Sequence, residues 1–531
     1  MRTRIVGKIV DTAANSTQCG ERQFVTGALR RIKGSMQWLR QVGAAARRFF
    51  PTQELSSALS FQENQVFWAL RNLPVSEAVK HFLICGTTGS GKTTAIQLFL
   101  QSIAPRFRPE RTPPEQLIIY DAKCDVLPLL AALGLRPEDE HVWILNPADT
   151  RGAKWKLSEA VQEPVMARHL ASLLVPEEKN SNSPYWSDAG RELVYAAILG
   201  LNAAVGSRWE FRDLLCALDS AKHLAAVAAH HPRAKVLAAR VLDDENHSPG
   251  VLSTLGSKLG QFEQVAALWH TSKSGRSFSI PEFLSRPGVL VLGYDPVLKE
   301  SIWPINALMI RALTQEILRR PNTREPRHWF VLDEFPSMER VDRIHELLNR
   351  GRSKGASMLL GIANVSGLME TYGEHRTTDL LSLCTYKSFL RAGDATTAEW
   401  ASKHFGQVRR IEASHSETEG RNGSSSSVQY QLQDRSAFLP ALFLDLPLPE
   451  SGGRYSMVSD VACLGTTFFD ECRADDVFHL CLTADKNVDA VERRTSIAEQ
   501  TLLPWSDDEE KLYCGPKETA KRPNLPKRNR S

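Results

Sequence analysis

Residues 86–93 have the glycine, lysine and hydroxyl spacing of a loop that binds phosphate groups. They read Gly-Thr-Thr-Gly-Ser-Gly-Lys-Thr and fit the pattern G-x-x-x-x-G-K-[ST]. The glycines let successive backbone N–H groups turn toward a phosphate chain at the start of a helix, while Lys92 adds a cation and the Thr93 hydroxyl a ligand for Mg²⁺. An apolar run precedes the loop and a helical pattern follows it, as this chemistry requires. The expected nucleotide contacts are therefore Gly86, Thr87, Thr88, Gly89, Ser90, Gly91, Lys92, Thr93 and Thr94.

The second half of such a site is predicted at Asp333 and Glu334, which end the apolar run 329–332. An aspartate at the end of a strand holds Mg²⁺ through its water shell, together with Thr93. A glutamate next to it is placed to orient and deprotonate an attacking water. We therefore expect Asp333 to bind the metal and Glu334 to be the catalytic base. The cofactors are predicted to be ATP and Mg²⁺, because no guanine-reading N-K-x-D motif follows.

Residues 351–355, Gly-Arg-Ser-Lys-Gly, allow two interpretations. They match the G-x-S-x-G elbow of serine hydrolases, but that elbow needs a strand before the serine and a helix after it. The order here is reversed, because helical residues 341–349 precede and an apolar run follows. Arg352 instead lies at a turn of the kind where subunits meet in ring ATPases, so we expect its guanidinium to act on a neighbour's γ-phosphate. A solvated loop arginine is the alternative.

The elements that must position these residues alternate between short apolar runs and helical stretches, which is typical of a parallel α/β sheet. Seven runs are predicted to be buried strands: 81–86, 116–121, 141–146, 288–294, 328–334, 356–363 and 385–391. Between the third and the fourth lie about 130 residues, with periodic Leu and Ala and no comparable strand signal. The sequence therefore predicts an α/β fold with an all-helical domain inserted into it.

The composition is that of an ordinary globular protein in a reducing compartment. The 531 residues include 65 Lys or Arg and 61 Asp or Glu, which gives a formal net charge of +4, and nine Cys without a C-x-x-C pair. This cysteine pattern excludes a disulfide framework and a zinc ribbon. No apolar run reaches the ~18 residues that span a bilayer, and residues 11–22 are too polar for a signal peptide. We expect a cytoplasmic protein without a transmembrane segment.

Three further segments stand out by composition. The leader, residues 1–59, is strongly basic, and residues 25–50 carry apolar side chains at helical spacing. This pattern predicts an amphipathic helix that lies on a membrane, binds nucleic acid or docks on its own domain. Residues 420–427 are predicted to be a mobile loop. The end of the chain is predicted to be a disordered tail, in which Trp505 and the acids 507–510 are either a peptide for a partner or solvated.

With these parts in this order, the chain resembles the TraD/TraG-type coupling proteins of type IV secretion, which are relatives of the HerA/FtsK motor ATPases. The likeness covers about residues 60–465. Besides the phosphate loop, it rests on segments that run as in that family: 120–123 (YDAK), 145–149 (LNPAD), 185–193 (YWSDAGREL), 333–336 (DEFP), 346–355 (ELLNRGRSKG), 361–373 (GIANVSGLMETYG) and 397–406 (TAEWASKHFG).

The resemblance implies a RecA-like P-loop NTPase core with a parallel-rich central sheet and an inserted all-α domain. The expected parts are a basic leader over 1–59, a nucleotide-binding domain over 60–154 and 277–470, an all-α insert over 155–276, and a C-terminal extension over 471–531 that is largely disordered.

The resemblance also implies an ATP-driven DNA translocase that delivers DNA, or a DNA–protein complex, to conjugative type IV secretion. The implied partners are DNA, a relaxase or relaxosome, and the proteins of the secretion channel. The implied assembly is a homo-hexamer in which Arg352 matches the trans-acting arginine of the family. The leader is then expected to touch the surface of the inner membrane.

Two departures from the family leave other interpretations open. The family's γ-phosphate-sensing Gln is replaced here by Ala363, so either Asn364 next to it substitutes as a catalytic residue or hydrolysis is slow. Family members also usually begin with two transmembrane helices, whereas this sequence has the basic leader, which predicts a soluble variant, a membrane-surface form or a truncated relic. The alternatives are a nucleotide-binding adaptor for the relaxosome that does not pump, and a soluble HerA/FtsK-like motor in another DNA process.

Overall fold

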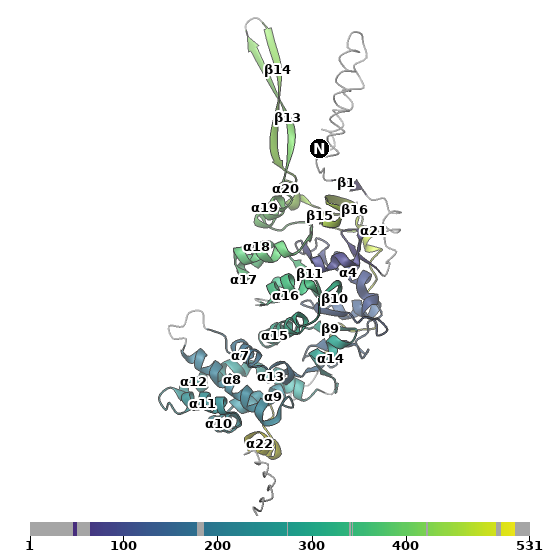
Figure 1. The fold of residues 1–531 in the computed structure, drawn as a ribbon. Helices are drawn as coiled ribbons and strands as arrows, with labels where there is room; N and C mark the ends of the chain where they lie inside the picture. The colour runs from purple at the N-terminus through teal and green to yellow at the C-terminus, as the bar shows by residue number, and fades with distance from the viewer. Residues whose placement is uncertain are drawn as a thin grey trace, which may run out of the picture.

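The computed structural model describes residues 46–49, 64–177, 185–272, 274–338, 341, 343–420, 423–494 and 501–515. Within these ranges a ten-stranded sheet forms the centre of the molecule, in the order β1-β16-β15-β12-β4-β11-β10-β5-β9-β6 (Figure 1). Helices cover both faces of the sheet, and a bundle of helices lies near its β9–β6 end (Figure 1).

All seven strands predicted from the sequence are present, and they run parallel to one another. Their side chains are mostly buried, because both faces of this part of the sheet are covered. Strands that are buried on both faces have continuous apolar runs in their sequence. The expected α/β fold with a parallel-rich sheet is confirmed. The strands are β4 (Phe82–Cys85), β5 (Gln116–Tyr120), β6 (Val142–Leu145), β9 (Gly288–Leu292), β10 (Thr323–Leu332), β11 (Lys354–Ile362) and β12 (Tyr386–Phe389).

Three strands that the sequence did not indicate extend the sheet. β15 (Arg454–Val461) runs antiparallel to both β12 and β16 (Thr466–Arg473). β1 (Ala46–Phe49) runs parallel to β16, with Ala46 opposite Phe468. The expectation of a helix up to residue 50 is therefore wrong for these four residues, because pairing with a distant strand overrides local spacing. The rest of the leader lies outside the described residues.

The helices divide between the two faces of the sheet. On one face lie α4 (Lys92–Ile103), α5 (Val126–Ala132) and the short hairpin of β2 (Gln65–Trp68) and β3 (Arg71–Pro74), around a core that contains Phe82, Phe99 and Trp329. The other face is covered by α15 (Lys299–Leu318), α16 (Ile344–Arg350), α17 (Val365–Tyr372), α18 (Glu374–Leu383), α19 (Ala395–His404) and α20 (Pro440–Asp445). These helices fix the loops at the carboxyl ends of the parallel strands.

Between β7 (Lys154–Trp155) and β8 (Ser277–Phe278) the described residues form the helical bundle, in which α8 (Tyr185–Val205) packs against five of the others. This is the stretch for which the sequence predicts an inserted domain, and the domain bounds remain that prediction. No helix within the described ranges is both long and apolar enough to span a membrane. The other bundle helices are α6 (Leu157–Ala160), α7 (Pro164–Leu174), α9 (Phe211–Leu218), α10 (Ala221–Ala228), α11 (Pro232–Leu242), α12 (Ser248–Leu259) and α13 (Glu263–His270), and α14 (Ile280–Ser285) leads back to β9.

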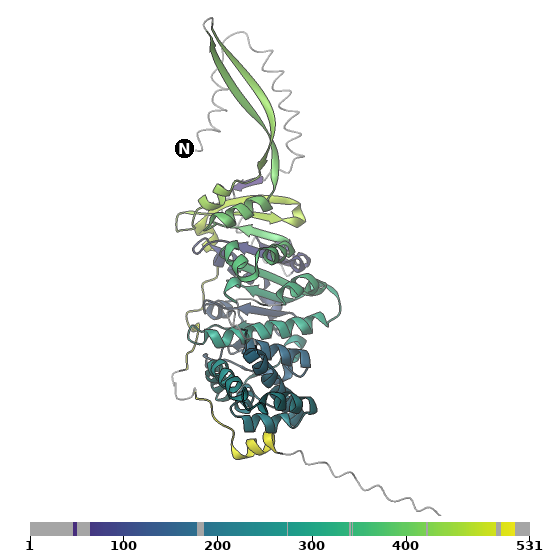
Figure 2. The same cartoon turned by 90° about the vertical axis from the view of Figure 1, so that its left-hand side faces the viewer.

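A long antiparallel hairpin projects from the body of the molecule (Figures 1 and 2). It consists of β13 (Gln407–Gly420) and β14 (Gly423–Ser436), with Gln407 opposite Ser436 at its base. The expectation of a mobile loop over 420–427 is therefore wrong for 423–427, which belong to β14. The pairing with β13 places these residues in the ladder, and the low-complexity serines carry no local pattern that shows it.

After α21 (Ala474–Phe478) the chain runs along one side of the molecule to α22 (Asp507–Cys514), at the end opposite the hairpin (Figure 2). It is held by hydrogen bonds on the way: Gln101 donates to the Leu480 carbonyl at 3.0 Å, and Arg494 donates to the Leu268 carbonyl at 2.9 Å. The expectation of a disordered tail is therefore wrong for 483–494 and for 501–515. Residues 516–531 lie outside the described residues.

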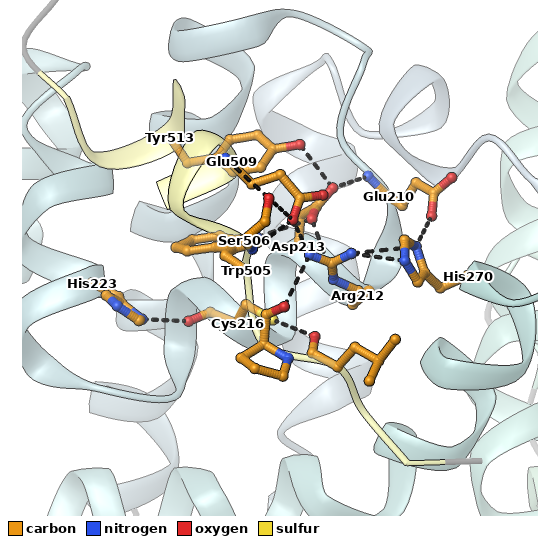
Figure 3. Close-up of polar contacts among 12 residues, drawn as sticks. Glu210, Arg212, Asp213, Cys216, His223, His270, Trp505, Ser506, Glu509 and Tyr513 are labelled. Atoms are coloured by element: carbon orange, nitrogen blue, oxygen red, sulfur yellow. Dashed lines mark hydrogen bonds and ion pairs between the residues drawn. The ribbon is translucent and has the colours of Figure 1, made fainter. Parts of the chain in front are cut away.

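The segment 501–515 is docked on α9 (Figure 3). The Trp505 indole N–H and the Tyr513 hydroxyl both donate to the Asp213 carboxylate, at 3.0 and 2.9 Å, and Arg212 donates to Glu509 at 2.8 Å. Trp505 and Tyr513 are only 9% and 5% exposed, so both rings belong to the core of the bundle. Trp505 is thus neither solvated nor free to bind a partner in this conformation.

Candidate nucleotide-binding site

The phosphate loop joins β4 to α4, as the sequence predicts, and its glycines are required by close contacts. A Cβ on Gly86 would lie 2.4 Å from the Ser90 hydroxyl oxygen. Gly91 has a φ of +93°, and a Cβ there would lie 2.4 Å from the Tyr455 ring, whose hydroxyl donates to the Gly91 carbonyl at 3.2 Å. Glycine also brings no side chain to cap α4, which leaves the N–H groups of its first turn for an anion.

Lys92 and the acidic pair come together at the carboxyl ends of the strands. The Lys92 ammonium lies 2.6 Å from the Glu334 carboxylate and 3.5 Å from that of Asp333, and the lysine side chain is only 5% exposed. β11 lies between β4 and β10, and its residue Gly361 leaves the space for Asp333, since a Cβ there would be 2.7 Å from the Asp333 Oδ1. The structure thus brings together Lys92, Thr93, Asp333 and Glu334.

Glu334 has a backbone conformation that a non-glycine residue seldom adopts. Its φ is +55°, in the left-handed region, and its N–H donates to Oδ1 of Asp333 at 3.0 Å. Strained backbone of this kind is concentrated at functional sites, where the surrounding structure holds it in place. The strain turns the Glu334 side chain toward the phosphate loop, which is where a base for an attacking water must lie.

Lys123 belongs to the same site, and its role was not assigned from the sequence. Its ammonium lies 2.8 Å from Asp333 and 3.3 Å from the Thr93 hydroxyl. Burial lowers the pKa of Lys123, but the hydrogen bond and the charge of Asp333 outweigh it, so the pKa is raised and the side chain stays charged. The signal that could have found it is its place in the segment 120–123, directly after β5.

The residues assigned to Mg²⁺ fit that ion. The Thr93 hydroxyl and the Asp333 carboxylate converge on one point, since the Lys123 ammonium contacts both. Two oxygen ligands from the protein suit Mg²⁺, which keeps waters and takes the rest of its octahedron from phosphates. Among the described residues, no group of three or more His, Cys, Asp or Glu side chains forms an alternative metal site.

Asn364, by contrast, is engaged in capping a helix. It follows β11 at the carboxyl edge of the sheet, and its side-chain oxygen accepts from the Gly367 N–H at 2.7 Å as the N-cap of α17. A sensor at this position would have to use the amide NH₂ group, because the oxygen is already occupied. Ala363, in the place of the family's Gln, has no polar side chain to offer.

Arg352 lies at the opposite end of the strands from the phosphate loop. It is exposed in the short turn η5 (Gly351–Ser353) that precedes β11, whereas the loop follows the carboxyl end of β4. Burial is the main cause that lowers the pKa of His81, which lies directly before β4, and the nearby charge of Arg352 lowers it further. The arginine therefore cannot reach the nucleotide of its own chain, and only a neighbouring molecule could bring it to a nucleotide.

The phosphate loop joins a parallel strand to the helix that follows it, and the loop lysine contacts an Asp-Glu pair at the end of a strand two positions away in the sheet. This is the arrangement of the P-loop nucleoside triphosphatases. Within this class the chain belongs to the type IV secretion-system coupling proteins, because the model of that family's DNA-binding domain matches residues 69–462.

The chain is similar to curated and solved members of that family. It is 23% identical to the coupling protein TraD of Escherichia coli K12 over 68% of this chain and 49% of TraD. It is 21% identical to the coupling protein VirD4 of Bartonella quintana over 68% of this chain and 58% of VirD4. The plasmid coupling protein TrwB, solved in complex with ADP and Mg²⁺, has the same fold, with a TM-score of 0.60 at 19% identity over 83% of this chain and 94% of TrwB. The chain thus spans about half the length of the curated relatives it matches.

Proposed function

We propose that the chain binds ATP and Mg²⁺ at residues 86–94 and hydrolyses the nucleotide. The observation that carries this proposal is the Lys92 ammonium at 2.6 Å from Glu334 and 3.5 Å from Asp333, beside a loop in which Gly86 and Gly91 leave no room for a Cβ. The adenine nucleotide and Mg²⁺ in the solved TrwB complex support the choice of cofactors.

Each side chain then has a defined task. Thr93 and Asp333 hold Mg²⁺, which neutralises charge on the phosphates during transfer. Lys92 leaves Glu334 for the outer phosphates, because a phosphate group offers more negative charge than one carboxylate. Glu334, released from the lysine, accepts a proton from the attacking water. Lys123 must also release Asp333 before that carboxylate can take part in binding Mg²⁺.

We further propose that several subunits act together as a ring. Arg352 is exposed at the end of the strands opposite its own phosphate loop, so a catalytic role for it requires a neighbour's nucleotide. A guanidinium supplied in trans stabilises charge in the transition state of phosphoryl transfer. A homo-hexamer, as the family resemblance implies, provides one such contact for every nucleotide.

The energy of hydrolysis would then move DNA. The family's DNA-binding domain covers residues 69–462, and motors of this type hold the phosphate backbone through charge rather than through base sequence. In conjugative type IV secretion the cargo is DNA or a DNA–protein complex, so the relaxosome and the channel proteins are the proposed partners. The basic leader is proposed to contact the anionic surface of the inner membrane.

A second candidate is an adaptor that binds ATP without pumping. The observation that favours it is Ala363 beside an Asn364 whose side-chain oxygen already caps α17. An adaptor would bind ATP tightly and release cargo on exchange of the nucleotide. A motor in another DNA process is the third candidate, and it would not associate with a relaxase or a secretion channel.

The test is the steady-state rate of ATP hydrolysis by the purified chain, with and without DNA. We expect stimulation by DNA, and a loss of about 100-fold or more in Lys92→Ala. Lys235→Ala, in an exposed position of α11, is the matched control and should keep the full rate. Tight ATP binding without turnover would favour the adaptor function over the motor function. Turnover that persists in Lys92→Ala would show that residues 86–94 are not the site of hydrolysis.

A further inference from the structure

The projecting hairpin has two different faces. In an antiparallel pair, residues directly opposite each other lie on the same face, and the faces alternate along each strand. The register places Ile411 opposite Leu432, and Tyr430 and Val428 follow on that same face at every second residue. Gln429, Gln431 and Gln433 occupy the alternate positions of β14, so they lie on the other face. Between Leu432 and Val428 the hairpin thus has one apolar side, which begins next to the Arg409–Asp434 pair nearer the base.

The apolar side is open in the described part of the chain. Ile411 is 61% exposed, Leu432 66%, Tyr430 71% and Val428 43%. Contiguous exposed apolar residues of this kind mark a surface that binds something. A two-stranded hairpin is also only marginally stable by itself, and it gains independent stability when a helix or a further strand packs on it.

The leader is the segment of this chain that we consider for covering that surface. It ends at β1, which pairs with β16 at the end of the sheet from which the hairpin rises (Figure 1). The leader has one apolar stripe at helical spacing, formed by Val25, Leu29, Ile32, Met36 and Leu39.

The dimensions also agree. A helix over residues 25–42 is about 27 Å long at 1.5 Å per residue. The exposed apolar side chains lie between Leu432, opposite Ile411, and Val428, which is about 13 Å at 3.3 Å per residue, and their far end is eight residue steps, about 26 Å, from the base at Ser436. One helix that starts near β1 therefore has the length to cover all four exposed side chains.

We propose that residues 22–44 form a helix that packs its apolar stripe on the Ile411–Val428–Tyr430–Leu432 face of the hairpin. The helix and the two strands then form a three-element projection with a small core of its own. The basic residues of the leader, among them Arg30, Arg31 and Lys33, flank the stripe and stay on the outer surface of this projection.

Photo-cross-linking of the full-length chain tests the proposal. A benzophenone amino acid replaces Tyr430 in one variant and Gln431, on the opposite face of the same strand, in the matched control. Mass spectrometry identifies the cross-linked peptides at several protein concentrations. We expect position 430 to label residues 22–44 of the same chain, independently of concentration and at least fivefold more than position 431 does.

Limited trypsin digestion gives a second measurement that needs no cross-linker. We expect cleavage after Arg30, Arg31 and Lys33 to become about tenfold faster in Leu432→Ser, because the helix loses an apolar partner. Gln431→Ser should leave the cleavage rate unchanged. Four outcomes would each overturn the proposal. In the cross-linking experiment these are cross-links confined to a second copy, cross-links only to lipid in vesicles with anionic headgroups, and equal labelling from both positions. In the digestion experiment it is a leader that is cleaved equally in all variants.

Discussion

Lys92 and Glu334 face each other beside the phosphate loop, with 2.6 Å between the ammonium nitrogen and a carboxylate oxygen. The two side chains neutralise each other in this conformation. Under the function proposed above, the phosphates would compete with Glu334 for Lys92, and binding of the nucleotide would free the carboxylate that we propose as the base. Nucleotide binding and activation of the base would then be one step.

Glu334→Gln should separate binding from chemistry. The amide still fits beside Lys92 but cannot accept the proton of water, so we expect kcat to fall by about 100-fold or more while ATP binding is kept. Lys92→Ala should lose the binding itself. The measurements are single-turnover hydrolysis and titration with a fluorescent ATP analogue. A Glu334→Gln variant that hydrolyses at the normal rate would assign the base to another residue.

Lys123→Ala should lower the concentration of Mg²⁺ that nucleotide binding requires. The Lys123 ammonium contacts the same two oxygens, on Asp333 and Thr93, that we assign to the metal, so it competes with the ion. The lysine is partly exposed, and the effect is therefore limited to about fivefold in the half-saturating Mg²⁺ concentration. Lys123→Arg keeps the charge and is the control. A requirement for more Mg²⁺ in Lys123→Ala would mean that the lysine assists the metal instead.

Asn364 needs two substitutions, because its oxygen caps α17 and its amide nitrogen is the group that could sense a phosphate. Asn364→Ala removes both functions and should lower the free energy of unfolding by about 1 kcal/mol. Asn364→Asp keeps the cap and removes the NH₂ donor. If Asn364 is a sensor, both variants should lose ATP hydrolysis at saturating nucleotide; loss in Asn364→Ala alone would assign it to the helix cap.

Arg352→Ala should reduce ATP hydrolysis only where subunits assemble. We expect kcat to fall by about 10³-fold or more with ATP binding unchanged, because the arginine acts on a neighbour's nucleotide. Arg350→Ala, an exposed arginine two residues earlier, is the matched control. Hydrolysis that is measured across a range of protein concentrations gives the second readout. A rate per subunit that does not depend on concentration, and is unaffected by Arg352→Ala, would contradict a trans role.

The contribution of Glu509 to the docking of α22 should be lost only in acid. The hydrogen bond from Arg212 lowers the pKa of Glu509 to about 2. A carboxylate with a depressed pKa stabilises the folded state above its unfolded pKa of about 4.3, and this contribution is lost as the pH falls through about 2. We therefore expect the difference in Trp505 fluorescence between the unaltered chain and Glu509→Gln, each corrected by the matching Trp505→Phe variant, to stay constant from pH 8 to 5 and to fall between pH 4 and 2. Glu509→Gln should loosen the segment already at pH 7.

The loop between β4 and α4 and the parallel strands could be predicted from the sequence because their signals are local. The loop needs glycines at fixed spacing, and strands buried on both faces must be apolar throughout, so 86–93 and the seven parallel strands were recognisable. Lys123 remained without a role because its task depends on Asp333, which is 210 residues away in sequence and 2.8 Å away in space.

The elements that were missed are held by distant partners. β1 is a strand because it pairs with β16, although its own residues continue a helical pattern. α22 is placed because Trp505 and Tyr513 bury their rings on α9 and donate to Asp213. In that case a local signal did exist, since Ser506 and Glu509 have the spacing of a capping box, and the capping box is present.

The position of β4 in the sheet also bears on how the protein is made. The strand that carries the phosphate loop pairs with β11 and β12, so Leu83 lies between Leu360 and Lys387. A ribosome that adds 5–20 residues per second reaches those partners roughly 15 to 60 s after β4 has been synthesised. The helical bundle forms mainly from neighbours in sequence and has no such delay. The nascent chain thus carries an unpaired apolar strand for most of its synthesis, and it depends on shielding from aggregation during that time.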